Sequence, residues 1–243
     1  MSTILALSPK IEHELTNISN YSGLIKDLHL DEFPAACLHG AIIYDKDGKV
    51  EKSTTLDPKF VLGVTDLMKK HNKTTMLYVA DWVAMASLEQ GGKTDWEAVS
   101  RGFDPMVKDE RDTEFLNKVL AGEEKIGKIF LPMDEELVPG QLISIRDFDS
   151  LLILLILDFL LLLRAEFPNT PFKTTRALPY IIEIVAETVD KSAALAFFCD
   201  KYNVKPENVM TFGDGENDVG MLTASGFGVS MGNAMDAPRL AAE

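Results

Sequence analysis

Residues 209–234 constrain the fold of this chain more than any other stretch, and they read "VMTFGDGENDVGMLTASGFGVSMGNA". The apolar residues 209–212 predict a strand, and Gly213-Asp214-Gly215 allow a sharp exit from it. An apolar helical segment and a second short strand, "FGVSM", follow. Strand, helix and strand in quick succession are typical of a parallel sheet. The sequence therefore predicts an α/β fold with a parallel sheet.

Polar residues follow the first of these strands directly. Ligands of open parallel sheets bind at the carboxyl ends of the strands, where Asp214 stands. Asn217 and Asp218 come at the start of the next helix, and Asp214 and Asp218 are four residues apart across a turn. Both carboxylates can therefore face one cation through oxygen atoms, which Mg²⁺ prefers. The alternative is that Asp214 and Asn217 are turn and cap residues only.

Composition excludes several functional classes. The formal net charge of -14 argues against nucleic acid as a partner, because like charges repel. The two cysteines, Cys37 and Cys199, form no close pair in the sequence, which indicates neither a disulfide framework nor a thiolate metal site. The amino-terminal sequence lacks the basic start and apolar core of a signal peptide. We therefore expect a cytoplasmic protein.

The leucine-rich segment 151–163, "LLILLILDFLLLL", is the most apolar part of the chain. A membrane span needs about 20 apolar residues, and this segment is shorter and contains Asp158. A carboxylate in the middle of a span would be costly. We therefore predict a buried or interface helix here and no membrane partner.

The rest of the chain alternates strands and helices. The sequence "GAIIYDKDGKVEKST" predicts a hairpin around the turn 45–48. Residues 57–72 have helical periodicity, and "TTMLYVA" and "KIGKIFL" indicate strands in a mixed α+β region. Further along, "FKTTRA" and "YIIEIVAE" predict paired strands, and "DKSAALAFFCDKYNV" predicts an amphipathic helix.

These stretches together resemble the Cof-like, subfamily IIB phosphatases of the haloacid-dehalogenase superfamily. The sequence "TFGDGENDVGMLTASGFGVSMGNA" resembles the family's fourth motif, with its GDxxND pattern and GNA turn. The sequence "YIIEIVAETVDKSAALAFFCDKYNV" resembles the third motif, in which a lysine, here Lys191, opens a helix. The hairpin "LHGAIIYDKDGKV" resembles the strand and turn before the family's cap domain. The resemblance covers roughly residues 20–240.

The resemblance implies a Rossmann-like core, residues 1–55 and 186–243, with an inserted α+β cap at residues 56–185. It further implies a Mg²⁺-dependent phosphomonoester hydrolase for a small phosphorylated metabolite, such as a sugar phosphate. Asp214 would be the main metal ligand, and Asp218 a ligand or its support. Asn217 would contact the phosphate or a metal-bound water, and Lys191 would hold the phosphate and the nucleophile.

The family's nucleophile is an aspartate in the motif DxDGT, and that motif does not occur in this sequence. Two stretches imitate it: Asp45 and Asp47 in "IIYDKDGKV", and Asp147 and Asp149 in "LISIRDFDSLL". The first matches the family's hairpin better than its nucleophile motif. The alternative to an active phosphatase is thus a catalytically inactive relative or a truncated gene product, which acts, if at all, by binding.

Two further positions differ from the family's pattern. No threonine or serine stands in the family's second-motif context, and Thr16 and Ser22 are candidates for that phosphate-binding hydroxyl by proximity only. His39 occupies the position before Gly-Ala where the family usually has asparagine.

Overall fold

The computed structural model describes residues 33–80, 82–91, 94–103, 106–133, 157–175 and 181–242. The chain divides into two compact units. One combines Met1–Thr54 with Val185–Glu243 and carries the motifs above, so we call it the motif unit. The other is Thr55–Ile184, which we call the inserted unit. The described chain is a mixture of helices and strands, which confirms the predicted α/β class.

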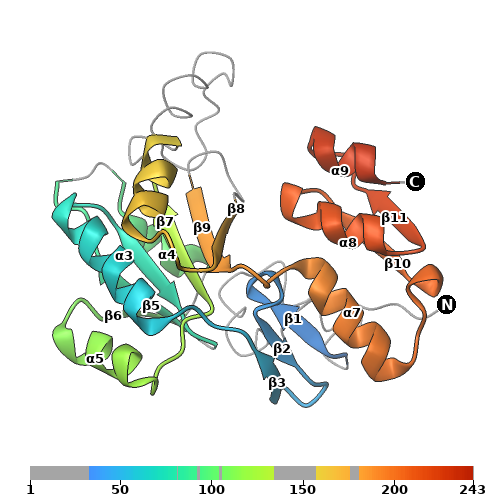
Figure 1. The fold of residues 1–243 in the computed structure, drawn as a ribbon, viewed down its shortest axis with the longest axis horizontal. Helices are drawn as coiled ribbons and strands as arrows, with labels where there is room; N and C mark the ends of the chain where they lie inside the picture. Colours follow the sequence, from blue (N-terminus) through green and yellow to red (C-terminus); the bar gives the residue numbers. More distant parts are fainter. Residues whose placement is uncertain are drawn as a thin grey trace. The chain divides into compact units, whose positions relative to one another are not determined.

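The inserted unit contains a six-stranded sheet with the order β6-β5-β4-β7-β9-β8 (Figure 1). Its strands are β4 (Thr75–Tyr78), β5 (Val83–Ser87), β6 (Val107–Asp109), β7 (Lys128–Pro132), β8 (Phe172–Thr175) and β9 (Ile181–Ala186). Its helices are α3 (Pro58–Lys70), α4 (Trp96–Phe103), α5 (Thr113–Ala121) and a further helix over residues 157–166. The predicted pairing of "FKTTRA" with "YIIEIVAE" is confirmed, because β8 and β9 are neighbours.

The sheet is mixed in direction. Strand β4 runs antiparallel to both β5 and β7, and β7 runs antiparallel to β9, whereas β5 and β6 are parallel. All five residues of β5 are buried. A strand buried on both faces requires packing partners on both sides of the sheet. This sheet therefore has a core of its own.

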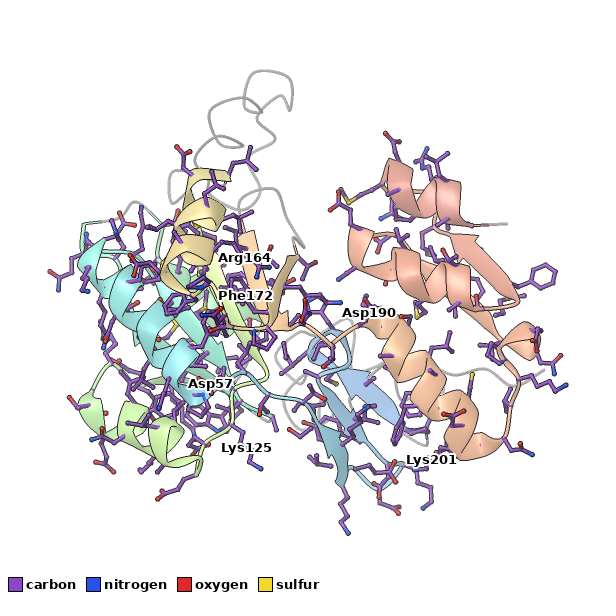
Figure 2. All side chains as sticks on the ribbon, viewed as in Figure 1. Asp57, Lys125, Arg164, Phe172, Asp190 and Lys201 are labelled. Atoms are coloured by element: carbon purple, nitrogen blue, oxygen red, sulfur yellow. The ribbon has the colours of Figure 1, made fainter. Side chains whose placement is uncertain are left out.

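The residues at the start of helix α3 determine where the helix begins. The Asp57 carboxylate accepts a hydrogen bond from the Phe60 amide at 3.0 Å, and Pro58 occupies the first turn, where its missing N–H costs nothing. The ring of Phe60 stacks on that of Phe172 at 4.7 Å between centroids. The Arg164 guanidinium lies over the Phe172 ring, 4.0 Å from its centroid (Figure 2).

The leucine-rich segment falls only partly within the described residues. Residues 157–166 are helical, as predicted, and Leu163 is buried, whereas Leu157 and Leu161 are exposed. The predicted buried or interface helix is therefore a helix over its described residues, with one side buried and the other exposed. No helix in the described part of the chain is long and apolar enough to cross a membrane.

The motif unit begins with a three-stranded antiparallel sheet, β1-β2-β3. Its strands are β1 (Ala35–Cys37), β2 (Ile42–Tyr44) and β3 (Val50–Ser53), with the 3₁₀ turn η3 (Leu38–Gly40) between the first two. The predicted hairpin joins β2 to β3. The Asp45 carboxylate accepts hydrogen bonds from the Asp47 and Lys49 amides at 2.9 and 2.8 Å, and Gly48 takes a left-handed φ of 74°.

The remainder of the motif unit is a parallel strand pair with its helices. In chain order these are α7 (Lys191–Tyr202), η4 (Pro206–Asn208), β10 (Met210–Gly213), η5 (Glu216–Asp218), α8 (Val219–Ala224), β11 (Phe227–Ser230) and α9 (Asp236–Ala241). Strands β10 and β11 pair in parallel, as the sequence predicts.

Helix α7 packs against both sheets of its unit, which is why its apolar stripe is wide. Ala194 and Phe198 contact Ile43 of β2. Leu195 and Cys199 form a second cluster with Val209 at the start of β10. The helix therefore holds the hairpin and the β10 strand in one unit.

One face of the β10–β11 pair is open. Phe212 and Phe227 are 54% and 59% exposed, whereas Thr211, Gly213 and Gly228 are buried on the other face. The strand predicted from the apolar residues 209–212 is confirmed, but Phe212, one of these apolar residues, is exposed. Buried and exposed residues alternate along the strand because only one of its faces is covered in the described part of this unit.

Candidate functional site

The loop after β10 turns back on itself because two glycines leave room for it. A Cβ on Gly213 would lie 2.4 Å from the Cβ of Asp218, which is closer than any side chain tolerates. A Cβ on Gly215 would lie 2.7 Å from Asn217 Oδ1. Glycine at both positions therefore lets the side chains of Asn217 and Asp218 fold over the end of the strand.

Asp218 is the buried centre of this loop. Its Oδ2 accepts hydrogen bonds from the backbone amides of Asp214 and Gly215, at 2.9 and 3.0 Å. Its Oδ1 accepts a hydrogen bond from Lys191 Nζ at 2.5 Å. The Asp218 side chain is 6% exposed and that of Lys191 is 31% exposed. The structure therefore brings together two of the predicted residues from motifs 27 positions apart.

Lys191 stands at an unusual place for a cation. It is the first residue of α7, where the positive end of the helix dipole disfavours positive charge. The helix is capped by Asp190, whose carboxylate accepts hydrogen bonds from the Ser192 amide and hydroxyl at 2.8 and 2.7 Å. Asp190 marks the start of α7 in Figure 2. The negative charge of Asp218 compensates for the unfavourable helix dipole at Lys191. The contact between the two side chains places the ammonium group beside the loop after β10.

The electrostatics of the loop keep Asp218 ionised. Burial acts to raise the pKa of Asp218, but the hydrogen bond from Lys191 and the amides of Gly215 and Asp214 act against it. The net effect is a pKa below the ordinary value of 3.8. Asp218 is therefore a carboxylate at neutral pH.

Asp214, unlike Asp218, is exposed. Its Oδ2 accepts a hydrogen bond from Asn233 Nδ2 at 3.2 Å, and its backbone carbonyl accepts one from the Met235 amide at 3.0 Å. The "GNA" turn after β11 thus contacts the loop after β10. We did not single out Asn233 from the sequence, although the GNA turn that contains it is part of the resemblance.

Asn217 contacts a residue from the other end of the sequence. Its Nδ2 lies 3.0 Å from Nδ1 of His39, in the η3 turn. From the sequence His39 was only a departure from the family's pattern, and no local signal indicates this contact. It forms because η3 and η5 both lie against α7.

The donors at this loop suit a hard divalent cation. Asp214 and Asp218 supply carboxylate oxygens, and the carboxamide oxygen of Asn217 lies over the cradle that the missing Cβ of Gly215 leaves. Within the described ranges, no group of three or more His, Cys, Asp or Glu side chains converges on one point. Mg²⁺ commonly takes one or two protein carboxylates and completes its shell with water and phosphate oxygens. The residues present therefore fit Mg²⁺.

The other sequence candidates lie elsewhere. Asp45 and Asp47 belong to the β2–β3 hairpin turn, where the Lys49 amide and, to a smaller extent, the Asp47 amide hold the pKa of the Asp45 carboxyl below its ordinary value. The structure thus gives Asp45 a role in the turn. Four further candidates lie outside the described residues: Thr16, Ser22, Asp147 and Asp149.

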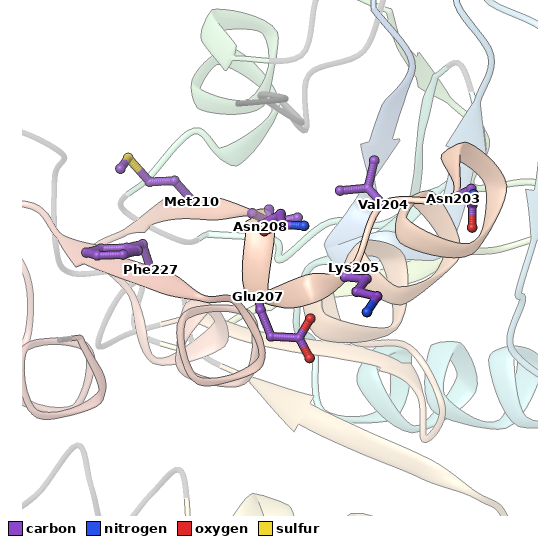
Figure 3. Close-up of a pocket in the computed structure, with 8 residues that line it drawn as sticks. Asn203, Val204, Lys205, Glu207, Asn208, Met210 and Phe227 are labelled. Carbon is purple, nitrogen blue, oxygen red and sulfur yellow. The ribbon is translucent and has the colours of Figure 1, made fainter.

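A pocket of about 710 Å³ lies at the opposite end of the same strands. It is lined by the loop after α7 and by the first residues of β10 and β11 (Figure 3). Ligands in parallel sheets bind at the carboxyl ends of the strands, and this pocket lies at the amino ends. It is therefore separate from the loop that carries Asp214 and Asp218.

Comparison with known proteins places the chain in a family. The family model described as haloacid dehalogenase-like hydrolase matches residues 17–243. An uncharacterized hydrolase of Schizosaccharomyces pombe is 30% identical over 214 residues, which are 86% of this chain and 63% of that protein. A Bacillus subtilis 5-amino-6-(5-phospho-D-ribitylamino)uracil phosphatase is 43% identical over 68 residues, 28% of this chain and 27% of that protein.

Solved structures agree on the fold. A haloacid dehalogenase-like hydrolase from Bacteroides thetaiotaomicron superposes with a TM-score of 0.67 at 18% identity and covers 98% of this chain and 77% of that one. A sugar phosphatase of haloacid dehalogenase subclass IIB superposes with a TM-score of 0.64 at 15% identity, covering 98% and 84%. The chain belongs to the haloacid dehalogenase-like hydrolase family and has the fold of its Cof-like, subclass IIB members.

Proposed function

We propose that the motif unit carries a Mg²⁺-dependent phosphomonoesterase site for a small phosphorylated metabolite. The observation that carries the proposal is the contact of 2.5 Å between Lys191 and Asp218, which joins a phosphate-binding cation to an acidic loop at the carboxyl end of a parallel strand. Phosphatases among the relatives support the reaction class. Since the chain spans 63% of the length of its Schizosaccharomyces relative, the activity of the whole protein is part of this proposal.

In this proposal each residue of the loop has one task. Asp214, which is exposed, binds the cation directly. Asp218 is a second ligand or supports Asp214, and it orients Lys191. The Lys191 ammonium group and the amino end of α7 attract the phosphate oxygens. Asn217 contacts the phosphate or a water on the cation. The bound Mg²⁺ would offset the charge of the phosphate and polarise it.

The inserted unit completes the proposal as the cap domain, residues 55–184. A separate unit with its own sheet can diverge without disturbing the β10 loop. We propose that it selects the substrate, and the subclass IIB sugar phosphatase of the same fold makes a sugar phosphate the first substrate class to test.

The second candidate function is phosphate binding without turnover. Asp214 and Asp218 are the two acids that the proposed cation site uses, and both oxygens of Asp218 already accept hydrogen bonds. A nucleophilic carboxylate would have to come in addition to these two. A protein with the present loop alone would bind a cation and a phosphate and leave the ester intact.

Hydrolysis of p-nitrophenyl phosphate by the full chain tests the proposal, in Mg²⁺ and in chelator. Asp214→Ala is the test variant, and Glu216→Ala is the matched control, because Glu216 is an exposed acid of the same loop. We expect turnover that requires Mg²⁺ and is lost in Asp214→Ala but kept in Glu216→Ala. Mg²⁺-dependent binding of inorganic phosphate without turnover would support the second candidate instead. Equal activity in both variants would reveal a contaminating phosphatase.

A further inference from the structure

His39 lies in a turn whose backbone is held in an uncommon conformation. Leu38, His39 and Gly40 have φ angles of 51°, 60° and 95°, so three successive residues are left-handed. For a residue with a side chain this conformation costs about 1–2 kcal/mol. Such a turn persists only where its surroundings hold it, and it is a frequent device for aiming a side chain.

The surroundings in this case are the first turn of α7. A Cβ on Gly40 would lie 2.9 Å from the carbonyl oxygen of Asp190 and 3.1 Å from the Cβ of Ala194. Only glycine allows so close an approach at this φ. The turn is therefore pressed against the helix that begins with Lys191, and His39 is held at a defined distance from the site.

The contact between the two side chains determines which way the carboxamide of Asn217 points. The atom that faces His39 Nδ1 at 3.0 Å is Nδ2, which can only donate a hydrogen bond. Acceptance at Nδ1 requires the tautomer of the imidazole that carries its proton on Nε2. Oδ1 of Asn217 then points away from the ring. It lies 2.7 Å from the Cβ position of Gly215, and Asp218 Oδ2 lies 3.7 Å from the same point.

We propose that His39 is a positioning residue: it holds the Asn217 carboxamide with its oxygen beside the oxygens of the acidic loop, where it can accept a hydrogen bond from a cation-bound water. The inference deepens the proposed function and rests on it for the cation. Without His39, either end of the carboxamide could face the loop. An amide N–H₂ group turned toward the cation would repel it.

Nuclear magnetic resonance of the full ¹⁵N-labelled chain tests this proposal at neutral pH. The ring nitrogens of His39 report the tautomer, and the side-chain NH₂ signals of Asn217 report its hydrogen bond. The test variant is His39→Gly, because glycine accepts a φ of 60° and removes the ring without straining the turn. His39→Asn restores an acceptor in a residue that tolerates this φ. Leu38→Gly is the matched control for the backbone of the turn.

We expect His39 to carry its proton on Nε2, and the Asn217 NH₂ signals to move in His39→Gly but not in Leu38→Gly. A MgCl₂ titration, followed through the backbone amides of Asp214 and Gly215, should show about fivefold weaker binding in His39→Gly, the effect of one lost hydrogen bond. The Mg²⁺ affinities of His39→Asn and Leu38→Gly should stay within about twofold of that of the natural protein.

Two results would overturn the proposal, and they are distinct. Unchanged Asn217 signals or unchanged Mg²⁺ affinity in His39→Gly, with the natural protein binding Mg²⁺, would remove the positioning role alone. A natural protein that does not respond to Mg²⁺ would remove the proposed function, and with it the cation that Asn217 is proposed to serve.

Discussion

The two sheets of this protein are stabilised in different ways. In the inserted unit, strands such as β5 are buried on both faces, and large side chains such as Trp96 and Phe172 are almost fully enclosed. In the motif unit, the β10–β11 pair exposes Phe212 and Phe227 on one face and carries a polar loop at its end. Packing of apolar side chains stabilises the first sheet. The conformation of the loop depends instead on glycines and on hydrogen bonds to one carboxylate.

This difference explains why the proposed site lies in the motif unit. A packed core tolerates no ligand, because every side chain already has its neighbours. The loop after β10 instead begins with Asp214, an exposed acid, beside the partly buried ion pair of Lys191 and Asp218. The geometry of the site therefore depends on a few short contacts, and the stability of the inserted unit depends on many weak ones.

The largest expected effect is a loss of core volume in the inserted unit. Phe60 is 2% exposed and stacks on Phe172, so Phe60→Ala should lower the free energy of unfolding by about 3–5 kcal/mol. Urea unfolding followed by tryptophan fluorescence measures it, because both tryptophans, Trp82 and Trp96, lie in this unit. A loss below about 1 kcal/mol would mean that this sheet is not held by packing.

A methyl group in the loop should have the next largest effect. Gly213→Ala places a Cβ 2.4 Å from that of Asp218 and should cost the motif unit about 2–3 kcal/mol. Gly232→Ala is the matched control, since no atom lies within 4 Å of its Cβ position. We expect the control to stay within about 0.5 kcal/mol of the natural protein. Hydrogen exchange of the β10 and α8 amides measures both, and equal protection in the two variants would contradict the geometry.

The Asp218 carboxylate should give the motif unit an acid-sensitive stability. Its folded pKa lies below the ordinary 3.8, so the unfolded chain binds the proton first as the pH falls. The stabilisation is therefore present above about pH 4 and is lost as the pH falls through the folded pKa. Asp218→Asn should cost about 2 kcal/mol at pH 7, the worth of a hydrogen bond to a charged group.

The same variant should also respond less to acid than the natural protein does. Unfolding of the motif unit between pH 6 and pH 3, followed by hydrogen exchange, compares the two proteins. Parallel pH profiles would show that another group accounts for the acid sensitivity.

The smallest effect is expected on the open face of β10. Phe212 is 54% exposed, so Phe212→Ala should change the stability of the motif unit by less than about 1 kcal/mol. Hydrogen exchange of the β10 amides is again the measurement. A loss as large as that of Phe60→Ala would mean that this face is covered in solution, and the contrast between the two sheets would then fail.

Local patterns were sufficient to predict most elements. The turn at Asp45 to Gly48, the cap at Asp57 and the strand, loop and helix around Asp214 all depend on residues adjacent in the sequence, so their signals are local. The same is true of the family resemblance, which rests on contiguous motifs. The exposure of Phe212 was not predictable in this way, because an apolar strand reads the same whether one face or both are covered.

The sequence by itself determined the type of fold and which acids, amide and lysine make up the proposed site, because a short motif specifies each of them. Only the tertiary structure decided that Lys191 reaches Asp218 and that His39 reaches Asn217 from 178 residues away. Both contacts form because α7 packs against the hairpin and against β10 at once. Which partners a helix brings together depends on how its whole surface is buried, and no local pattern contains that information.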